Sequence, residues 1–179
     1  SIYHTSRLRF CYSGNGMNGA GEIASLTALT LPDIAMITRI TNTHSGFFDT
    51  MEDIAAAKAE IFQGLKAGGV AVLNLDDPFF PQLATAANKA GAGRIITFGR
   101  KDDAEFCLLE ACQNDNGMSV QGQVAGHKLT FDMQMHGVHW AQNAFGALAC
   151  VEALGLNLEL AAAHLATCRT PEGRGSRLS

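Results

Sequence analysis

Residues 50–75, TMEDIAAAKAEIFQGLKAGGVAVLNL, decide the fold, because they predict a helix that is followed at once by a buried strand. Thr50 stands three residues before Asp53, an arrangement that resembles a capping box and marks a helix start. The run from Gly69 to Leu75 is apolar, as a buried strand is. Between them, apolar residues recur at the three-to-four-residue spacing of a helix face that packs on a core. This stripe consists of Met51, Ile54, Ile61 and Leu65.

The same alternation extends outward on both sides of this stretch. Helices are expected at Glu22–Leu31 and Pro81–Ala90, and strands from Ile34 and over Arg94–Phe98. Short connections between such elements indicate a parallel sheet covered by helices. After Gly99 the pattern predicts an antiparallel meander of three strands and then two helices. These are the strands Ala104–Cys112, Met118–Val124 and Lys128–Met135, and the helices Trp140–Ala153 and Leu158–Ala166. The expected fold class is therefore α/β, with a mostly parallel sheet flanked by helices and an antiparallel three-strand meander with two helices behind it.

Composition excludes several classes of protein. The chain has 179 residues, of which 47% are hydrophobic and 17% charged, as in an ordinary globular domain. The net charge of −4 and the lack of a Lys/Arg cluster argue against a nucleic-acid partner. No apolar stretch approaches the length of a membrane span, and the N-terminal residues show no charged-then-apolar leader pattern, so no membrane partner is expected.

Lys58 is the most informative single residue. It falls in a gap of the apolar stripe, so its side chain is expected to point toward the core. A buried ammonium group is unfavourable unless it reaches water, finds an anion or is chemically altered. The alternative is a lysine that extends past the edge of the helix into water. The alanines around it favour the inward orientation, because small residues let other groups approach closely.

His44 is a second candidate, because it follows the strand that begins at Ile34. Ligands in open parallel sheets bind at the carboxyl ends of the strands. A histidine in a loop is often just solvated, so its position beside an inward lysine is what supports a site. His136 and His139 have no further ligand at a suitable spacing, and we expect no metal site there.

The sequence matches the pattern of one nucleotide-binding motif and lacks another. Residues 14–19 match G-x-G-x-x-G, but the acidic residue that a dinucleotide fold places at the end of its next strand is missing, since Asp33 precedes that strand. The sequence contains no G-x-x-x-x-G-K-[ST] phosphate loop. A dinucleotide-binding domain therefore stays open as an alternative but is not favoured.

Several motifs together resemble the Mur ligase family. They are Gly16-Met17-Asn18, Thr43-His44, the segment 57–62 around Lys58, Gly137-Val138-His139 with Asn143, and Pro171 with Gly173-Arg174-Gly175. The resemblance spans about residues 14–177. It implies that residues 14–99 form the α/β part, residues 100–135 antiparallel strands and residues 136–170 a helical part. Residues 1–13 stay unassigned, and residues 171–179 would be a hinge to a C-terminal domain.

The resemblance implies an ATP-dependent ligase of the cytoplasm that forms an amide during peptidoglycan precursor synthesis. In this scheme ATP and Mg²⁺ are cofactors, and the partners are a UDP-linked muropeptide and D-alanyl-D-alanine. Lys58 would be catalytic and carbamylated, and would hold Mg²⁺ together with His44. Asn143, His139 and Arg174 would contact the nucleotide. Asn18 would lie on the substrate side.

The sequence also departs from the family pattern. Gly14 stands where the family has a metal-binding glutamate, and Trp140 follows His139 where an asparagine is usual. Without a phosphate loop, the isolated chain is expected to be inactive and to hold no cofactor, because phosphoryl transfer needs a phosphate cradle and a metal together. A non-catalytic pseudo-enzyme or nucleotide-binding module is the alternative from another functional class.

Overall fold

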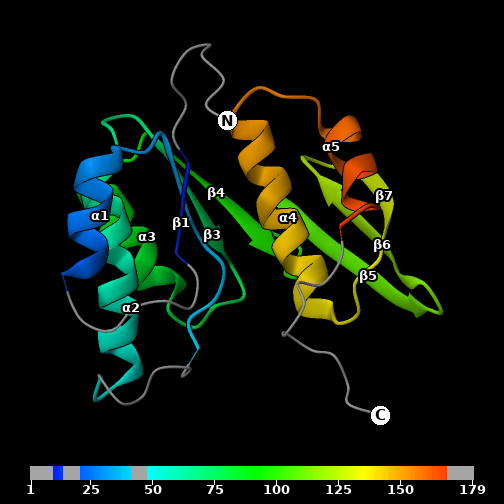
Figure 1. Ribbon diagram of the computed structural model, residues 1–179, viewed down its shortest axis with the longest axis horizontal. Coiled ribbons are helices and arrows are strands. Elements are labelled where there is room, and N and C mark those ends of the chain that lie inside the picture. The colour runs from blue at the N-terminus through cyan, green and yellow to red at the C-terminus, as the bar shows by residue number, and fades with distance from the viewer. Residues whose placement is uncertain (1–9, 14–20, 42–47, 169–179) are drawn as a thin grey trace. The chain divides into compact units, whose positions relative to one another are not determined.

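The structure is a computed structural model that describes residues 10–13, 21–41 and 48–168 of the chain. The chain divides into two compact units, Ser1–Thr97 and Phe98–Ser179 (Figure 1). Strand β4 crosses the boundary between them. No helix among the described residues is long and apolar enough to span a membrane.

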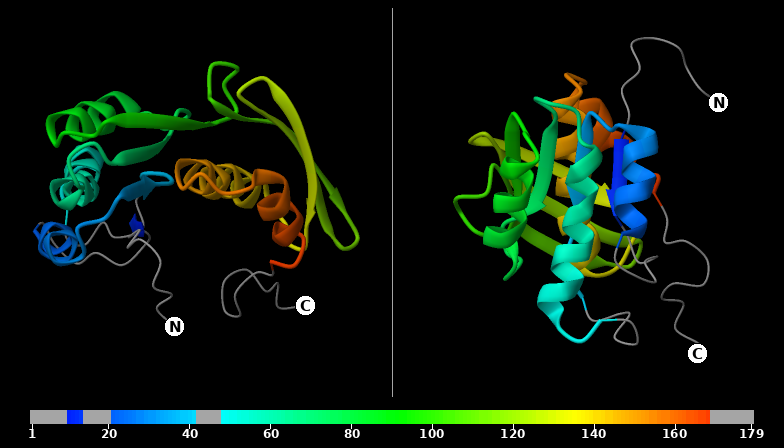
Figure 2. Two further views of the ribbon diagram at one scale, coloured as in Figure 1. Left: turned by 90° about the horizontal axis from the view of Figure 1, so that it is seen from above. Right: turned by 90° about the vertical axis from the view of Figure 1, so that its left-hand side faces the viewer.

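The first unit is a parallel sheet that carries its helices on one face (Figure 2). The strands follow the order β1-β2-β3-β4, and Ile34 of β2 lies between Phe10 of β1 and Val70 of β3. Its elements are β1 (Phe10–Ser13), α1 (Glu22–Thr30), β2 (Ile34–Ile37), α2 (Met51–Ala59), the 3-10 helix η1 (Glu60–Gly64), β3 (Val70–Asn74), α3 (Phe80–Lys89) and the start of β4 (Arg94–Gly99). Helices that join successive parallel strands in this way confirm the predicted first half of the fold.

The core of the first unit lies between the helices and the sheet. Ile61 and Phe62 are buried against the small and apolar residues of β2 and β3, such as Ala35 and Leu73. The predicted helix over residues 50–65 ends differently from the expectation, because its last turn is the 3-10 helix η1. There Gly64 lies so close to the backbone of Thr27 in α1 that a Cβ atom would overlap it. This end of the helix therefore packs tightly against α1, an element distant in sequence.

The predicted capping box at the start of α2 is confirmed. Thr50 Oγ1 accepts a hydrogen bond from the Asp53 N–H at 3.1 Å, and Asp53 Oδ2 accepts one from the Thr50 N–H at 3.1 Å. These bonds satisfy donors that have no partner within the helix.

Thr50→Ala is expected to lower the free energy of unfolding by about 1 kcal/mol, because the alanine cannot accept the hydrogen bond from Asp53. Urea unfolding measures the loss. Thr85→Ala is the matched control, since the exposed Thr85 hydroxyl donates only within its own helix, to the Pro81 carbonyl. Equal losses for the two variants would contradict the importance of the cap.

The second unit contains the predicted antiparallel meander with two helices. The last residues of β4, Phe98 and Gly99, pair in parallel with Phe106 and Cys107, and the remaining pairs are antiparallel. Helix α4 contacts β5, and α5 contacts β7. The further elements are β5 (Phe106–Asn114), β6 (Gly117–Val124), β7 (His127–Met133), α4 (Val138–Ala153) and α5 (Leu158–Leu165). The expected fold class is confirmed in both units.

Candidate functional site

Lys58 is buried in α2, with only 4% of its surface exposed. Its Nζ donates a hydrogen bond to the Arg39 carbonyl oxygen at 3.2 Å. Arg39 stands two residues after the end of β2, so the amino group lies at the carboxyl end of that strand. The inward orientation predicted from the interrupted stripe is therefore present. Neighbouring Ala55 and Ala57 are also buried, and their small side chains leave room for the lysine in this layer.

A buried aspartate holds the backbone beside Lys58. Asp77 is 3% exposed and follows β3, whose carboxyl end lies next to that of β2. Its Oδ2 accepts a hydrogen bond from the Ile40 N–H at 2.7 Å, and its Oδ1 accepts one from the Phe79 N–H at 2.8 Å. Asp77 thus ties the segment after β2 to the segment after β3.

Asp77 was not predicted from the sequence, and neither was the equally buried Asn74, whose Oδ1 accepts a hydrogen bond from the Asp76 N–H at 2.9 Å. A usable signal was present. The polar residues Asn74, Asp76 and Asp77 come at and just after the end of a predicted strand, where the rule that singled out His44 also applies.

Burial lowers the pKa of Lys58 below the ordinary lysine value, and the negative charge of Asp77 opposes that shift. Desolvation disfavours the charged ammonium form, whereas a nearby anion favours it. The lowered pKa raises the fraction of neutral amine at a given pH. Only the neutral amine is nucleophilic, so the burial of Lys58 suits it to react with an electrophile such as CO₂.

Lys58→Met is expected to increase the stability of the chain below the folded-state pKa of Lys58. In the folded chain the pKa of Lys58 lies below 10.5, the ordinary value that it has in the unfolded chain. At pH values between the folded and the unfolded pKa, the unfolded chain therefore binds more protons than the folded chain. The wild type becomes more stable as the pH rises through this range. The advantage of the methionine variant should therefore shrink as the pH approaches 10.5. Urea unfolding of both proteins across this range measures it, and an advantage that grows with pH would contradict the account.

Two other predicted residues lie in the second unit. His139 lies on the first turn of α4 and is exposed, and Asn143 is half-buried. The two residues are four positions, about one helical turn, apart. The ring centroids of His139 and Trp140 are 5.2 Å apart. His139 and Asn143 therefore share one face of α4. His44, Asn18, Arg174 and the glycine motif at 14–19 lie outside the described residues.

The described residues around Lys58 do not make a magnesium site by themselves. Mg²⁺ prefers oxygen ligands in octahedral geometry, and an ammonium group offers none. Both oxygens of Asp77 already accept backbone hydrogen bonds. Within the ranges that the structure describes, no three His, Cys, Asp or Glu side chains gather to hold a metal ion.

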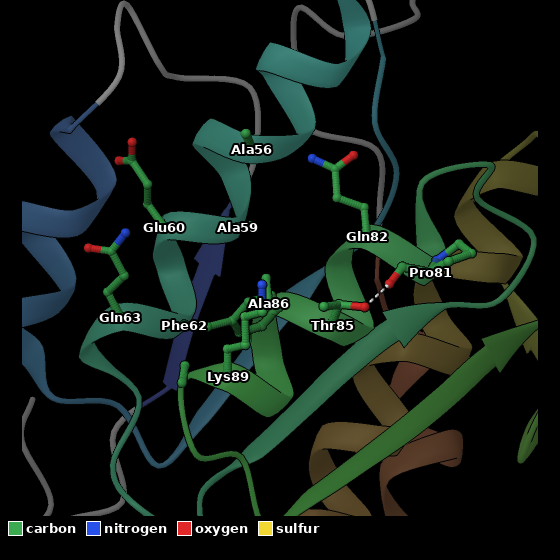
Figure 3. A pocket seen from close by; sticks show the side chains of 11 residues that line it. Ala56, Ala59, Glu60, Phe62, Gln63, Pro81, Gln82, Thr85, Ala86 and Lys89 are labelled. Carbon is green, nitrogen blue, oxygen red and sulfur yellow. Dashed lines mark hydrogen bonds between the residues drawn. The ribbon is translucent and has the colours of Figure 1, made fainter.

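An open groove of about 850 Å³ lies on the outer side of the helices, over α2, η1 and α3 (Figure 3). Alanines and Phe62 line it together with polar side chains such as Gln63, Gln82 and Lys89. Neither Lys58 nor Asp77 reaches this groove, so it is separate from the candidate site.

Comparison with known proteins agrees with the fold and with the family that the sequence resembles. A family model described as Mur ligase middle domain matches residues 9–151. UDP-N-acetylmuramoyl-tripeptide–D-alanyl-D-alanine ligase of Rickettsia prowazekii is 29% identical over 160 residues, which are 89% of this chain and 36% of that protein. The enzyme with the same name from Bacillus subtilis is 32% identical over 150 residues, which are 84% of this chain and 31% of that protein.

Solved structures give the same result. The crystal structure of MurF from Acinetobacter baumannii superimposes with a TM-score of 0.80 at 27% identity, over 89% of this chain and 34% of that one. MurF ligase from Thermotoga maritima in complex with ADP has a TM-score of 0.73 at 23% identity, over 87% of this chain and 35% of that one, and supports the fold alone. The chain spans about a third of the length of these relatives. It belongs to the Mur ligase family, whose middle-domain pattern it carries over residues 9–151.

Proposed function

We propose that the chain is the Lys58-bearing part of an ATP-dependent, ADP-forming ligase that joins D-alanyl-D-alanine to UDP-N-acetylmuramoyl-tripeptide. The observation that carries this proposal is the buried Lys58, whose amino group lies at the carboxyl end of β2. The names of the relatives in Rickettsia prowazekii and Bacillus subtilis support the choice of substrates. A cytoplasmic location follows, since ATP and UDP-linked precursors are found there.

In the proposed reaction, a substrate carboxylate attacks the γ-phosphorus of ATP and ADP leaves. The incoming amine then attacks the acyl carbon, the C–N bond forms, inorganic phosphate leaves and the amine loses a proton. Bound Mg²⁺ would neutralise charge on the phosphates. Lys58 and His44 would hold the ion once Lys58 is carbamylated, because the carbamate turns a cation into an oxygen ligand. Asn143 and His139 would contact the adenine end, with Arg174 nearby and Asn18 on the substrate side.

The isolated chain is expected to release no phosphate from ATP, because its sequence contains no phosphate loop. Phosphate contacts supply much of the affinity for a nucleotide, so ATP binding should also be feeble. Phosphate release is measured with tripeptide precursor, D-alanyl-D-alanine and Mg²⁺, against a blank without protein. Turnover above the blank would contradict the proposed inactivity.

The proposed function itself is tested in a chimera, in which this chain replaces the matched stretch of the Rickettsia prowazekii relative. The chimera is made with Gly14 and with Gly14→Glu, because the family resemblance places a metal-binding glutamate there. We expect the glutamate form to release phosphate only when both muropeptide and D-alanyl-D-alanine are present, and the glycine form to need more Mg²⁺. A folded glutamate chimera without turnover would favour a pseudo-enzyme, and micromolar NAD binding would favour a dinucleotide-binding domain.

A further inference from the structure

Glu60 stands two residues after Lys58, at the point where α2 becomes the 3-10 helix η1. Its carboxylate reaches across to the first turn of α1 (Figure 3). Glu60 Oε1 accepts a hydrogen bond from the Gly21 N–H at 2.7 Å, and Oε2 accepts one from the Ala24 N–H at 3.2 Å. One carboxylate therefore binds the start of a helix that comes 36 to 39 residues earlier in the sequence.

Helix α1 has no capping side chain of its own. Its N-cap residue is Gly21, and no side chain of that residue accepts a hydrogen bond. The first N–H groups of a helix have no partner within the helix, and a negative charge near them is favourable. Glu60 thus supplies, from another helix, the cap that α1 lacks.

The backbone around Glu60 also lies against α1. The side chain of Thr27 is fully buried there, and its hydroxyl oxygen lies 3.5 Å from the Glu60 carbonyl oxygen. At the end of η1, Gly64 lies so close to the backbone of Thr27 that a Cβ atom would overlap it. Helix α1 therefore packs along the whole turn that follows Lys58, and the Glu60 carboxylate is the charged part of this contact.

Lys58 and Glu60 leave this turn in different directions, because residues two positions apart on a helix do not share a face. The Lys58 Nζ reaches the Arg39 carbonyl oxygen at the carboxyl end of β2, whereas the Glu60 carboxylate reaches α1. The turn is thus fastened to the end of a strand on one side and to a helix on the other. A rotation of the turn that released Glu60 from α1 would also move the Lys58 amine.

We propose that Glu60 is a positioning residue of the ligase reaction, which fixes the turn that carries Lys58 against the start of α1. Glu60 acts through Lys58, by keeping the amine at the carboxyl end of β2. The inference rests on the proposed function, in which the place of this amine affects a rate. A displacement of about 1 Å at a reacting group can cost about a hundredfold in rate. The alternative is that Glu60 stabilises α1 and has no effect on the reaction.

The first test measures the reactivity of the Lys58 amine in the isolated chain, by brief treatment with acetic anhydride and mass spectrometry of the peptides. Lys58 is 4% exposed, so it should react slowly relative to Lys89, an exposed lysine of α3. Glu60→Ala should raise the ratio of Lys58 to Lys89 acetylation by roughly fivefold, because the turn opens more often. Glu60→Gln keeps one acceptor oxygen and should change the ratio by less than about twofold.

Thr50→Ala is the matched control for this first test. It weakens the other end of the same helix, where Thr50 caps α2, and leaves the contact with α1 intact. The acetylation ratio should therefore stay within about twofold of the wild type. If Glu60→Ala does not fold, Glu60→Asp takes its place. The shorter side chain keeps the charge but cannot reach both N–H groups, so the ratio should rise by more than about twofold.

The second test measures the reaction in the Gly14→Glu chimera with the Rickettsia prowazekii relative. Glu60→Ala should lower kcat about tenfold and leave the KM for D-alanyl-D-alanine within about twofold, because the amine is misplaced and that substrate is not. The Mg²⁺ concentration for half-maximal rate should rise by about fivefold, since the carbamate of Lys58 would help to hold the ion. Glu60→Gln should restore most of both values.

An unchanged acetylation ratio in Glu60→Ala, or an equal rise in Thr50→Ala, would overturn the inference. So would a Glu60→Ala chimera that has a lower Tm but the parental kcat and Mg²⁺ requirement, since Glu60 would then only cap α1. Failure of the proposed function gives a different result. If acetylation of Lys58 rises as expected but the parent chimera releases no phosphate, Glu60 still holds the Lys58 turn and the ligase activity is rejected.

Discussion

Asp77→Ala is expected to lower the free energy of unfolding by about 4 kcal/mol. The carboxylate accepts hydrogen bonds from the Ile40 and Phe79 N–H groups, and alanine removes both acceptors. Ile40 is 5% exposed, so its N–H would be left buried without a partner. Bonds to charged acceptors contribute about 1.5–3 kcal/mol each, and an unsatisfied buried donor adds to the loss. Alanine also removes the negative charge that stabilises the ammonium form of Lys58, so the pKa of Lys58 should fall further.

Two further variants separate these causes. Asp77→Asn keeps one carbonyl oxygen in place, so the loss should be about 2 kcal/mol. Asp103→Ala changes an exposed aspartate of the second unit and should cost about 0.5 kcal/mol or less. Urea unfolding measures all three. Similar losses for Asp77→Ala and Asp103→Ala would show that the buried carboxylate does not hold the two strand ends together.

Gly122→Ala is expected to cost about 3 kcal/mol, although alanine is usually tolerated in a strand. A Cβ atom at this position of β6 would overlap the Phe145 ring and the Cys107 carbonyl oxygen. Phe145 is fully buried and its ring centroid lies 6.0 Å from that of Phe131, so it has little room to move. Overpacking of a core typically costs about 1–3 kcal/mol, and a backbone atom in the contact favours the upper end.

A double-mutant cycle with Phe145→Leu tests the physical cause of this loss. The smaller leucine should relieve part of the overlap, so the two substitutions together should cost about 1 kcal/mol less than the sum of the single losses. Thermal and urea unfolding of the four proteins give the coupling. Strictly additive losses would place the strain at Cys107 or elsewhere in the sheet rather than at the Phe145 ring.

Local patterns predicted the fold well, because the signals for its helices and strands lie within a few residues of one another in the sequence. The capping residues Thr50 and Asp53 are three positions apart, and the apolar stripe begins at Met51 in α2 and continues through η1 to Leu65. The 3-10 end of the same helix was not predictable in this way. At that end Gly64 lies against the backbone of Thr27, a contact between residues 37 positions apart that no local pattern encodes.

The candidate site was predictable where one residue broke a pattern. Lys58 interrupts an apolar stripe, so its burial could be expected from the sequence alone. Asp77 interrupts no apolar stripe, and its place just after a predicted strand indicates the sheet edge without showing which group it binds. Its role becomes visible only when Ile40, which lies far from it in sequence, is seen to donate to its carboxylate. His139 and Asn143 were singled out through the family resemblance, and their shared helix face is a finding of the structure.

The central claim is that the buried amine of Lys58 acts in amide bond formation, and phosphate release by the chimera tests it most directly. In the Gly14→Glu chimera, with muropeptide, D-alanyl-D-alanine and Mg²⁺ present, Lys58→Ala should lower the rate by about a thousandfold, as the loss of a group that supports the transition-state charge does. Lys66→Ala is the control, since Lys66 is a partly exposed lysine that pairs with Asp33 at 2.6 Å, away from the site. Its rate should stay within about twofold of the parent. Both variants must keep the parent's Tm within a few degrees. A folded Lys58→Ala chimera that turns over at the parental rate would contradict the claim.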